Sequence, residues 1–155
     1  MTLNLSKRLH HRPPYLLIDE VVSHSKEELH ARKVCKQSDH FIQGHFPNAP
    51  VVPGAMMQEM TTQAAGALLA EHFSPVKDYD SETTKGFAIG VLRAVHNAKF
   101  KSFARPDEVM DIQVKLIQNL ENSFRFQGSI MINGNKIMSN EFTLINISDE
   151  KLIGN

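Results

Sequence analysis

The most constraining feature of this sequence is residues 54–72, GAMMQEMTTQAAGALLAEH, a proline-free run composed mostly of good helix formers. This composition predicts one helix over 54–72. Apolar side chains surround its second half on every side, which is typical of a helix buried on all faces. The apolar run AAGALLA is far too short to cross a bilayer, so we expect no membrane insertion. The rest of the chain must therefore fold around this helix.

Three prolines precede the helix, at positions 47, 50 and 53. Proline fixes φ and lacks an N–H donor, so residues 46–53 cannot lie within a helix or a central strand. We expect a stiff, extended approach to the helix. Such a segment can aim a side chain at its start, and His45 stands there.

Most of the remaining chain has the composition of β-strands, which we predict at 15–22, 29–34, 86–103, 110–117, 124–132 and 136–147. Asn133-Gly134 indicates a tight hairpin between the last two. Residues 5–12 favour a short amphipathic turn, residues 74–85 a mobile connection, and the tail from Ser148 a frayed end. Together these elements predict an α+β fold in which a curled antiparallel sheet packs on the helix.

The length and composition suit one domain over residues 1–155. The chain has 155 residues, of which 41% are hydrophobic, and no linker-like stretch divides it. Cys35 is the only cysteine, and the N-terminus lacks the pattern of a secretory signal, which together favour the cytoplasm. The 17 basic residues balance the 17 acidic ones, so nothing global indicates a nucleic-acid partner.

Basic residues nevertheless gather in two acid-free segments, residues 1–18 and 85–105. Either segment is a candidate docking surface for an acidic partner. The alternative is an ordinary solvated surface whose compensating acids lie nearby in the folded protein. The sequence leaves both interpretations open.

Two side chains in the central region can carry chemistry, Glu59 and His45. A carboxylate in a buried helix is costly unless it is paired, hydrogen-bonded or protonated with a raised pKa. Taken alone, the residues favour a structural Glu59, exposed at an edge of the helix or held by Gln63 one turn later. For His45, the adjoining glycine, phenylalanine and proline restrict the backbone and favour an aimed imidazole.

The motifs of several other chemistries are absent from the sequence. It contains no G-x-x-x-x-G-K-[ST] phosphate loop, no H-E-x-x-H or C-x-x-C metal motif and no G-x-S-x-G nucleophile elbow. We therefore expect no nucleotide cofactor, no catalytic metal and no serine nucleophile.

Two motifs occur together at a characteristic spacing. The first is HRPPYLLIDEV at 11–21; the second is GHFPNAPVVPG at 44–54, followed by Glu59 and Gln63. This combination resembles the 3-hydroxyacyl-[acyl carrier protein] dehydratases of bacterial fatty-acid synthesis, of the FabZ type. The later strands are compatible with that family, so the resemblance spans most of the chain.

The resemblance implies a hotdog fold, in which the curled antiparallel sheet wraps the helix at 54–72. It implies a homodimer or a trimer of dimers, and an acyl carrier protein as partner. The substrate would be an acyl thioester carried on the phosphopantetheine of that partner, so we expect no cofactor of the enzyme's own.

The resemblance also assigns site residues. His45 and Glu59 are implied as the catalytic acid/base pair, facing each other across the dimer interface. The backbone N–H of Gly54 is implied as the oxyanion donor, and we group Phe46 and Gln63 with it as residues that bind the substrate.

The chain departs from the family pattern at two points. Met60 follows Glu59, where the family commonly has a small residue, and residues 106–108 read Pro-Asp-Glu where it commonly has a P-G-D turn. Met60 can narrow an acyl tunnel, which leaves the chain-length preference open. The methionines near Glu59, with Phe46 and Phe87, can line such a tunnel, although core filling is the commoner use of methionine.

Two other functions are compatible with the same features. One is a hotdog acyl-thioester hydrolase, which would activate water with the carboxylate of Glu59. The other is a non-catalytic acyl-binding subunit that keeps the fold. The joint presence of His45, Gly54 and Glu59 argues against the second.

Overall fold

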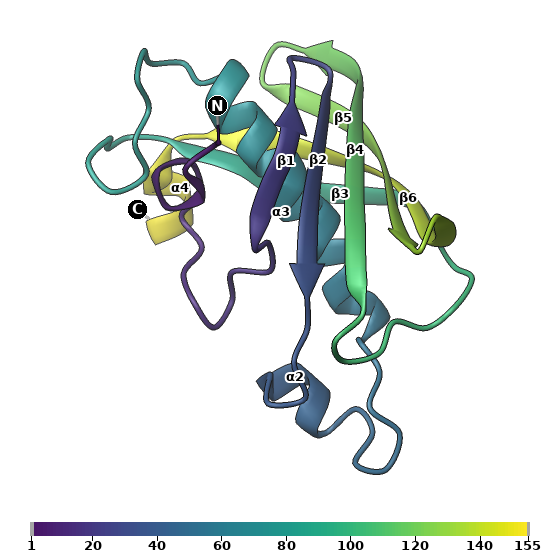
Figure 1. The fold of residues 1–155 in the computed structure, drawn as a ribbon. Helices are drawn as coiled ribbons and strands as arrows, with labels where there is room; N and C mark the ends of the chain where they lie inside the picture. Colours follow the sequence, from purple (N-terminus) through teal and green to yellow (C-terminus); the bar gives the residue numbers. More distant parts are fainter. Residues whose placement is uncertain (1, 155) are drawn as a thin grey trace.

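The computed structural model describes residues 2–154 and shows a six-stranded antiparallel sheet with one long helix against it (Figure 1). The helix, α3, spans Gly54–His72. The strand order is β1-β2-β4-β5-β6-β3. The strands span Glu20–His24 (β1), Glu28–Val34 (β2), Ala88–Phe100 (β3), Val109–Leu120 (β4), Ser123–Ile132 (β5) and Asn135–Ile147 (β6). Three short helices span Leu5–Arg8 (α1), His40–Gln43 (α2) and Asp149–Ile153 (α4). The predicted α+β hotdog fold, with its central helix at 54–72, is confirmed.

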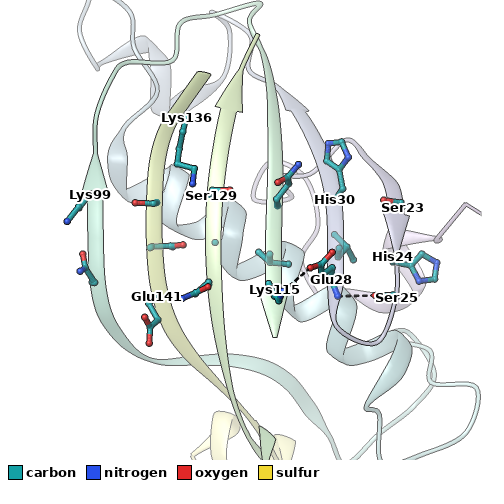
Figure 2. A pocket seen from close by; sticks show the side chains of 18 residues that line it. Ser23, His24, Ser25, Glu28, His30, Lys99, Lys115, Ser129, Lys136 and Glu141 are labelled. Carbon is teal, nitrogen blue, oxygen red and sulfur yellow. Dashed lines mark hydrogen bonds and ion pairs between the residues drawn. The ribbon is translucent and has the colours of Figure 1, made fainter. Parts of the chain in front are cut away.

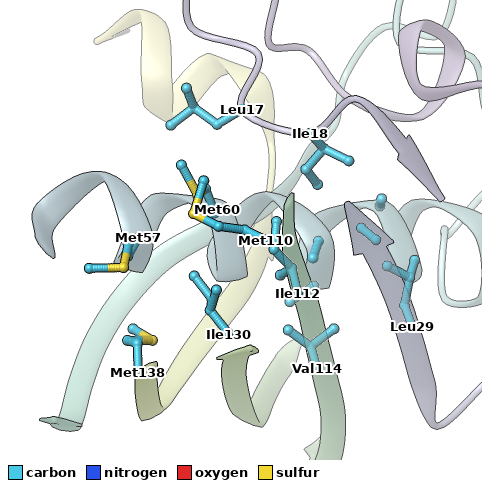
Figure 3. Close-up of a cluster of buried hydrophobic side chains, with 14 of the residues drawn as sticks. Leu17, Ile18, Leu29, Met57, Met60, Met110, Ile112, Val114, Ile130 and Met138 are labelled. Carbon is cyan, nitrogen blue, oxygen red and sulfur yellow. The ribbon is translucent and has the colours of Figure 1, made fainter. Parts of the chain in front are cut away.

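The sheet has one apolar face because its strands alternate. In β5, Phe124, Phe126 and Ile130 are buried, whereas Arg125 and Gln127, the alternate residues, are less buried. The buried side chains of sheet and helix form one cluster, part of which is drawn in Figure 3: Leu17, Ile18, Leu29, Met57, Met60, Met110, Ile112, Val114, Ile130 and Met138. The core therefore lies between α3 and the inner face of the sheet.

Helix α3 is surrounded as its composition predicts, and every residue from 60 to 70 is buried. Met57 and Met60 are 3% and 0% exposed, so these two methionines fill the core. The helix meets β3 most closely at two glycines, because a Cβ placed on Gly90 would lie 2.8 Å from the Cα of Gly66. Glycine at both positions permits this approach.

The predicted strand at 15–22 was wrong over its first half, because β1 begins only at Glu20. Leu17 and Ile18 are consecutive and both buried, at 1% and 2% exposure, which a strand with one solvated face does not allow. The backbone of this segment hydrogen-bonds to a side chain of α3, as described below. Residues 15–19 therefore lie across the helix before the chain enters the sheet.

Two polar segments are more structured than their composition indicates. The tail from Ser148 forms α4 rather than a frayed end, and Asp149 accepts a 2.8 Å hydrogen bond from the N–H of Gly86. In the connection 74–85, predicted to be mobile, Tyr79 is 2% exposed and the N–H of Ser81 donates to the carbonyl of Lys7 over 2.7 Å. One buried aromatic ring and a few backbone contacts hold this connection against the N-terminal segment.

Candidate active site

The loop before α3 aims the ring of His45. No helix or strand occurs at residues 44–53, as the prolines predict, and the loop is closed by a 2.9 Å hydrogen bond from the N–H of Val51 to the carbonyl of His45. The Nδ1 atom of His45 lies 3.1 Å from the carbonyl oxygen of Val51. Because a carbonyl oxygen only accepts, Nδ1 carries the proton in the neutral ring. Nε2 is therefore the basic nitrogen, free to take a proton.

Phe46 follows His45 through a cis peptide bond and stacks on it, with ring centroids 4.4 Å apart and an interplanar angle of 23°. Its side chain is 57% exposed. A large exposed aromatic ring beside a candidate base is suited to contact another molecule. This position is consistent with the predicted contact to an acyl chain, which stays a prediction.

Gly54 is the first residue of α3. The N–H groups of Met56 and Met57 donate to the carbonyl of Pro53, over 3.0 and 3.1 Å, whereas that of Gly54 meets no protein acceptor within residues 2–154. A free N–H at the positive end of a helix dipole favours a developing oxyanion. A Cβ at this glycine would lie 3.1 Å from the ring of Phe100, so glycine also permits close packing at the helix start.

Glu59 lies just over one turn further along α3, with a side chain that is 16% exposed. Burial raises the pKa of its carboxyl group, and the hydrogen bond donated by Gln63 opposes that shift. The donor–acceptor distance from Gln63 Nε2 to Glu59 Oε1 is 3.0 Å. A carboxyl group with a raised pKa is suited to give up a proton as a general acid.

Gln63 is fully buried, and protein groups satisfy its amide. Its Oε1 accepts the N–H of Leu17 over 2.8 Å, and its Nε2 donates to the carbonyl of Tyr15 over 2.8 Å and to Glu59. These backbone partners fix the amide orientation, because one can only donate and the other can only accept. The grouping of Gln63 with the substrate-binding residues stays a prediction; in the structure its amide supports the carboxyl group of Glu59 through a hydrogen bond.

One functional candidate was missed when the residues were considered singly. His11 lies with its Nε2 atom 3.5 Å from Glu59 Oε1. Its only sequence signal is its place in HRPPYLLIDEV, the motif whose spacing to Glu59 carries the family resemblance.

The predicted pairing of His45 with Glu59 has no direct contact within the described chain. No hydrogen bond or ion pair joins their side chains in the described chain, and each has separate partners. Glu59 lies about 7.5 Å along the helix axis from Gly54, at a rise of 1.5 Å per residue. A site that joins His45 of one protomer to Glu59 of another stays a prediction.

A groove elsewhere on the molecule is unrelated to these residues. It has a volume of about 790 Å³ and crosses the outer face of the sheet, where polar side chains of several strands line it (Figure 2). His30, Lys99, Ser129 and Glu141 are among them. Neither His45 nor Glu59 contributes to this groove, so it is no part of the candidate site.

The two basic segments differ in the folded protein. In the first, Arg8 and Arg12 pair with Glu71 and Glu82 at 2.5 and 3.4 Å, so its compensating acids do lie nearby. In the second, four basic residues of and just after β3 have no carboxylate within 4.0 Å in residues 2–154: Arg93, Lys99, Lys101 and Arg105. In residues 2–154 the first segment leaves only Lys7, among its lysines and arginines, without a carboxylate within 4.0 Å, so the second is the stronger candidate docking surface.

Two further features are absent from residues 2–154. No group of three or more histidine, cysteine or acidic side chains is placed to hold a metal ion there. No helix of this part of the chain is both long enough and apolar enough to cross a membrane.

Comparison with known proteins gives consistent matches. The sequence model of the FabA-like domain matches residues 9–141. A 3-hydroxyacyl-[acyl-carrier-protein] dehydratase FabZ of Shewanella loihica is 35% identical over 136 residues, which are 87% of this chain and 84% of the relative. The enzyme of that name from Campylobacter lari is 29% identical over 140 residues, 90% and 92% of the two chains. Among solved structures, the dehydratase heterocomplex ApeI:P from Xenorhabdus doucetiae aligns over 99% of both chains with a TM-score of 0.72 at 18% identity, a likeness of fold.

Proposed function

This chain belongs to the FabA-like domain family, and we propose from that membership that it is a 3-hydroxyacyl-[acyl-carrier-protein] dehydratase of fatty-acid biosynthesis. It converts a (3R)-3-hydroxyacyl thioester into the trans-2-enoyl thioester and water. The single observation that carries this function is the match to dehydratases over most of the chain. The placement of His45, Gly54 and Glu59 supports it independently.

The reaction needs three groups, and the candidate site offers three. A base must take the C2 proton, and His45 has Nε2 free for it because Nδ1 faces the carbonyl of Val51. An acid must protonate the leaving hydroxyl at C3. Burial raises the pKa of the Glu59 carboxyl group, which favours its protonated form. The thioester oxygen gains negative charge, and the unpaired N–H of Gly54 can stabilise it.

Atoms and charges balance in this scheme whether the elimination occurs in one step or in two. The C2–H bond breaks toward His45, the electron pair forms the C2–C3 double bond, and the C3–O bond breaks as Glu59 donates its proton. Water leaves, and transfer of the proton from His45 back to Glu59 restores both groups. No further cofactor enters, since the phosphopantetheine arm belongs to the carrier protein that bears the substrate.

We propose a homodimer as the active unit, assembled through β3, with a trimer of dimers as its larger form. Strand β3 has 13 residues, lies at one edge of the sheet, and exposes apolar side chains along it: Leu92, Val95 and Phe100. A long edge with apolar side chains is a template for pairing with a second copy. Such pairing supports a site in which His45 of one protomer serves Glu59 of the other.

The acyl carrier protein is the proposed partner, and the cytoplasm the proposed location. Arg93, Lys99, Lys101 and Arg105 have no carboxylate within 4.0 Å in residues 2–154 and offer positive charge to an acidic surface. Docking through exposed charges weakens as salt screens them. Turnover of carrier-bound substrate should therefore fall more steeply with ionic strength than turnover of a small thioester analogue.

An assay with two substrates tests the function. The protein is incubated with a 3-hydroxyacyl thioester and, separately, with a saturated acyl thioester on the same carrier protein, at several chain lengths. Formation of the enoyl product from the first, without thiol release from the second, supports dehydration. Thiol release from both would establish a hydrolase instead, and tight binding without turnover would establish a non-catalytic subunit.

A further inference from the structure

The N-terminal segment brings a second imidazole to Glu59. His11 Nε2 lies 3.5 Å from Oε1 of that carboxyl group, and the His11 ring stacks on Tyr15 with centroids 6.0 Å apart and an interplanar angle of 26°. The proton transfers proposed above do not use His11. Because His11 lies beside the proposed acid, it can influence that acid without taking part in the proton transfers.

The two oxygens of Glu59 have different surroundings. Oε1 accepts the hydrogen bond of Gln63 and also faces His11, whereas Oε2 has no hydrogen-bond partner in residues 2–154. In a neutral carboxyl group one oxygen bears the proton and is the weaker hydrogen-bond acceptor, so N–H donors favour the other oxygen as the carbonyl oxygen. The acidic proton therefore belongs on Oε2, the oxygen without a protein partner.

The tautomer of His11 follows from the same contacts. Its Nδ1 atom is buried and has no hydrogen-bond partner. With the proton on Nδ1, a buried N–H would stay unpaired and two acceptors, Nε2 and Glu59 Oε1, would face each other. With the proton on Nε2, a donor lies 3.5 Å from the acceptor Oε1.

A neutral donor suits an acid that must hold its proton. Burial, followed by the nearby His10 and Arg12, lowers the pKa of His11, so its ring is neutral at neutral pH. A positive charge there would favour the ionised form of Glu59, whereas a neutral N–H orients the carboxyl group without adding charge. Tyr15 is the other titratable group that faces Glu59, and its pKa is raised by burial and then by that carboxyl group.

We propose that His11 is a positioning residue for Glu59: its Nε2–H and the amide of Gln63 together hold Oε1, so that Oε2 presents the proton to the substrate. The proposal rests on the proposed dehydratase function, since Glu59 is the acid of that reaction. A separation of 3.5 Å is longer than a formed hydrogen bond. Catalytic hydrogen bonds are often long in unliganded enzymes and shorten in the substrate complex.

Two substitutions of similar size distinguish the effect of the His11 N–H donor from the effect of side-chain volume. His11→Gln keeps a neutral N–H donor, and His11→Met removes it. We expect His11→Met to lower kcat at least about tenfold with KM changed less than about twofold, and His11→Gln to stay within about threefold of wild type. The same pair at His10, which contacts Tyr79 instead, controls for disturbance of the segment and should leave kcat within about twofold. Equal kcat for the two His11 variants would overturn the proposal.

A second measurement needs no turnover. The titration of the Glu59 carboxyl carbon, followed by NMR and assigned with Glu59→Gln, should move to higher pH in His11→Met than in wild type or His11→Gln, because a donor to the ionised form is lost. Identical titrations in all three proteins overturn the role of His11, whatever the activity. Absence of dehydration by the wild-type protein instead overturns the proposed function, so the two failures are distinguishable. His11→Phe, which keeps the stack on Tyr15, replaces the methionine variant if circular dichroism shows that it misfolds.

Discussion

The backbone N–H of Leu17 donates to the side-chain oxygen of Gln63 over 2.8 Å, joining two positions that lie 46 residues apart in the sequence. This contact turns the amide nitrogen of Gln63 toward Glu59. The segment at 11–19 thus covers the helix and also orients the support of the proposed acid. The two family motifs in the sequence, separated by more than 20 residues, meet at this point.

Gln63→Met should lose both functions of the amide. The N–H of Leu17 becomes a buried donor without a partner, so we expect the free energy of unfolding to fall by about 1–3 kcal/mol. Glu59 also loses the hydrogen bond that Gln63 donates, and kcat should fall at least about tenfold. Urea denaturation and dehydration kinetics measure the two effects. Gln37→Met, at an exposed glutamine, controls for the substitution and should change stability by less than about 0.5 kcal/mol.

His45→Ala and Glu59→Gln remove the proposed base and acid. Each should lower kcat/KM for dehydration at least about a hundredfold, because positioned general acids and bases contribute that much or more. The fold should persist, since His45 is in a loop and glutamine keeps the shape of Glu59. Kinetics together with circular dichroism check both statements. Near-normal dehydration by either variant contradicts the assignment.

The sequence predicts the framework of the fold because its signals are local. Residues 54–72 are proline-free and, in their second half, apolar on all sides, and they form one helix with those bounds. Alternation and the Asn133-Gly134 turn similarly locate the strands of the second half. The segment at 15–19 was mistaken for a strand because its apolar residues look the same whether they pair with a strand or lie on a helix. The contact that decides between these, with Gln63, is distant in sequence.

The site was predicted less completely, for a physical reason. Composition indicated that a charged Glu59 is unfavourable in a buried helix, and the structure shows the burial that raises its pKa. The family resemblance was needed to make it a proposed catalytic group. The closeness of His11 to Glu59 depends on how the 11–19 segment crosses α3, a tertiary arrangement that no periodicity encodes.

Gly90 and Gly66 allow β3 to contact α3, so a methyl group added at Gly90 should lower the free energy of unfolding. Gly90 also has a φ of +73°, and Gly134 has a φ of +77° with open space where a Cβ would go. Gly134→Ala therefore measures the backbone strain alone, about 1–2 kcal/mol. Gly90→Ala adds a clash with helix backbone and should lose about 1–3 kcal/mol more. Thermal and urea denaturation compare them; equal losses contradict the close-contact interpretation.

The raised pKa of Glu59 predicts a specific dependence of stability on pH. A carboxyl group whose pKa is higher in the folded state contributes stability that is fully present below its unfolded value, near 4.5, and is lost as pH rises through the folded value. Glu59→Gln removes this loss, so the variant should gain stability relative to wild type as pH rises above 4.5. Denaturation between pH 4 and pH 8 measures the difference. Glu27→Gln, at an exposed carboxyl group, controls for loss of one negative charge and should show no such trend.

Mixing two inactive variants tests whether the site spans two protomers. If His45 of one chain serves Glu59 of the other, a dimer of one His45→Ala chain and one Glu59→Gln chain has one intact site and one site with both defects. Random pairing makes half of the dimers mixed, so refolding the variants together should recover about a quarter of wild-type activity. Each variant refolded alone is the control and should stay inactive. If both groups served the same chain's site, mixing would recover nothing, since every site would keep one defect.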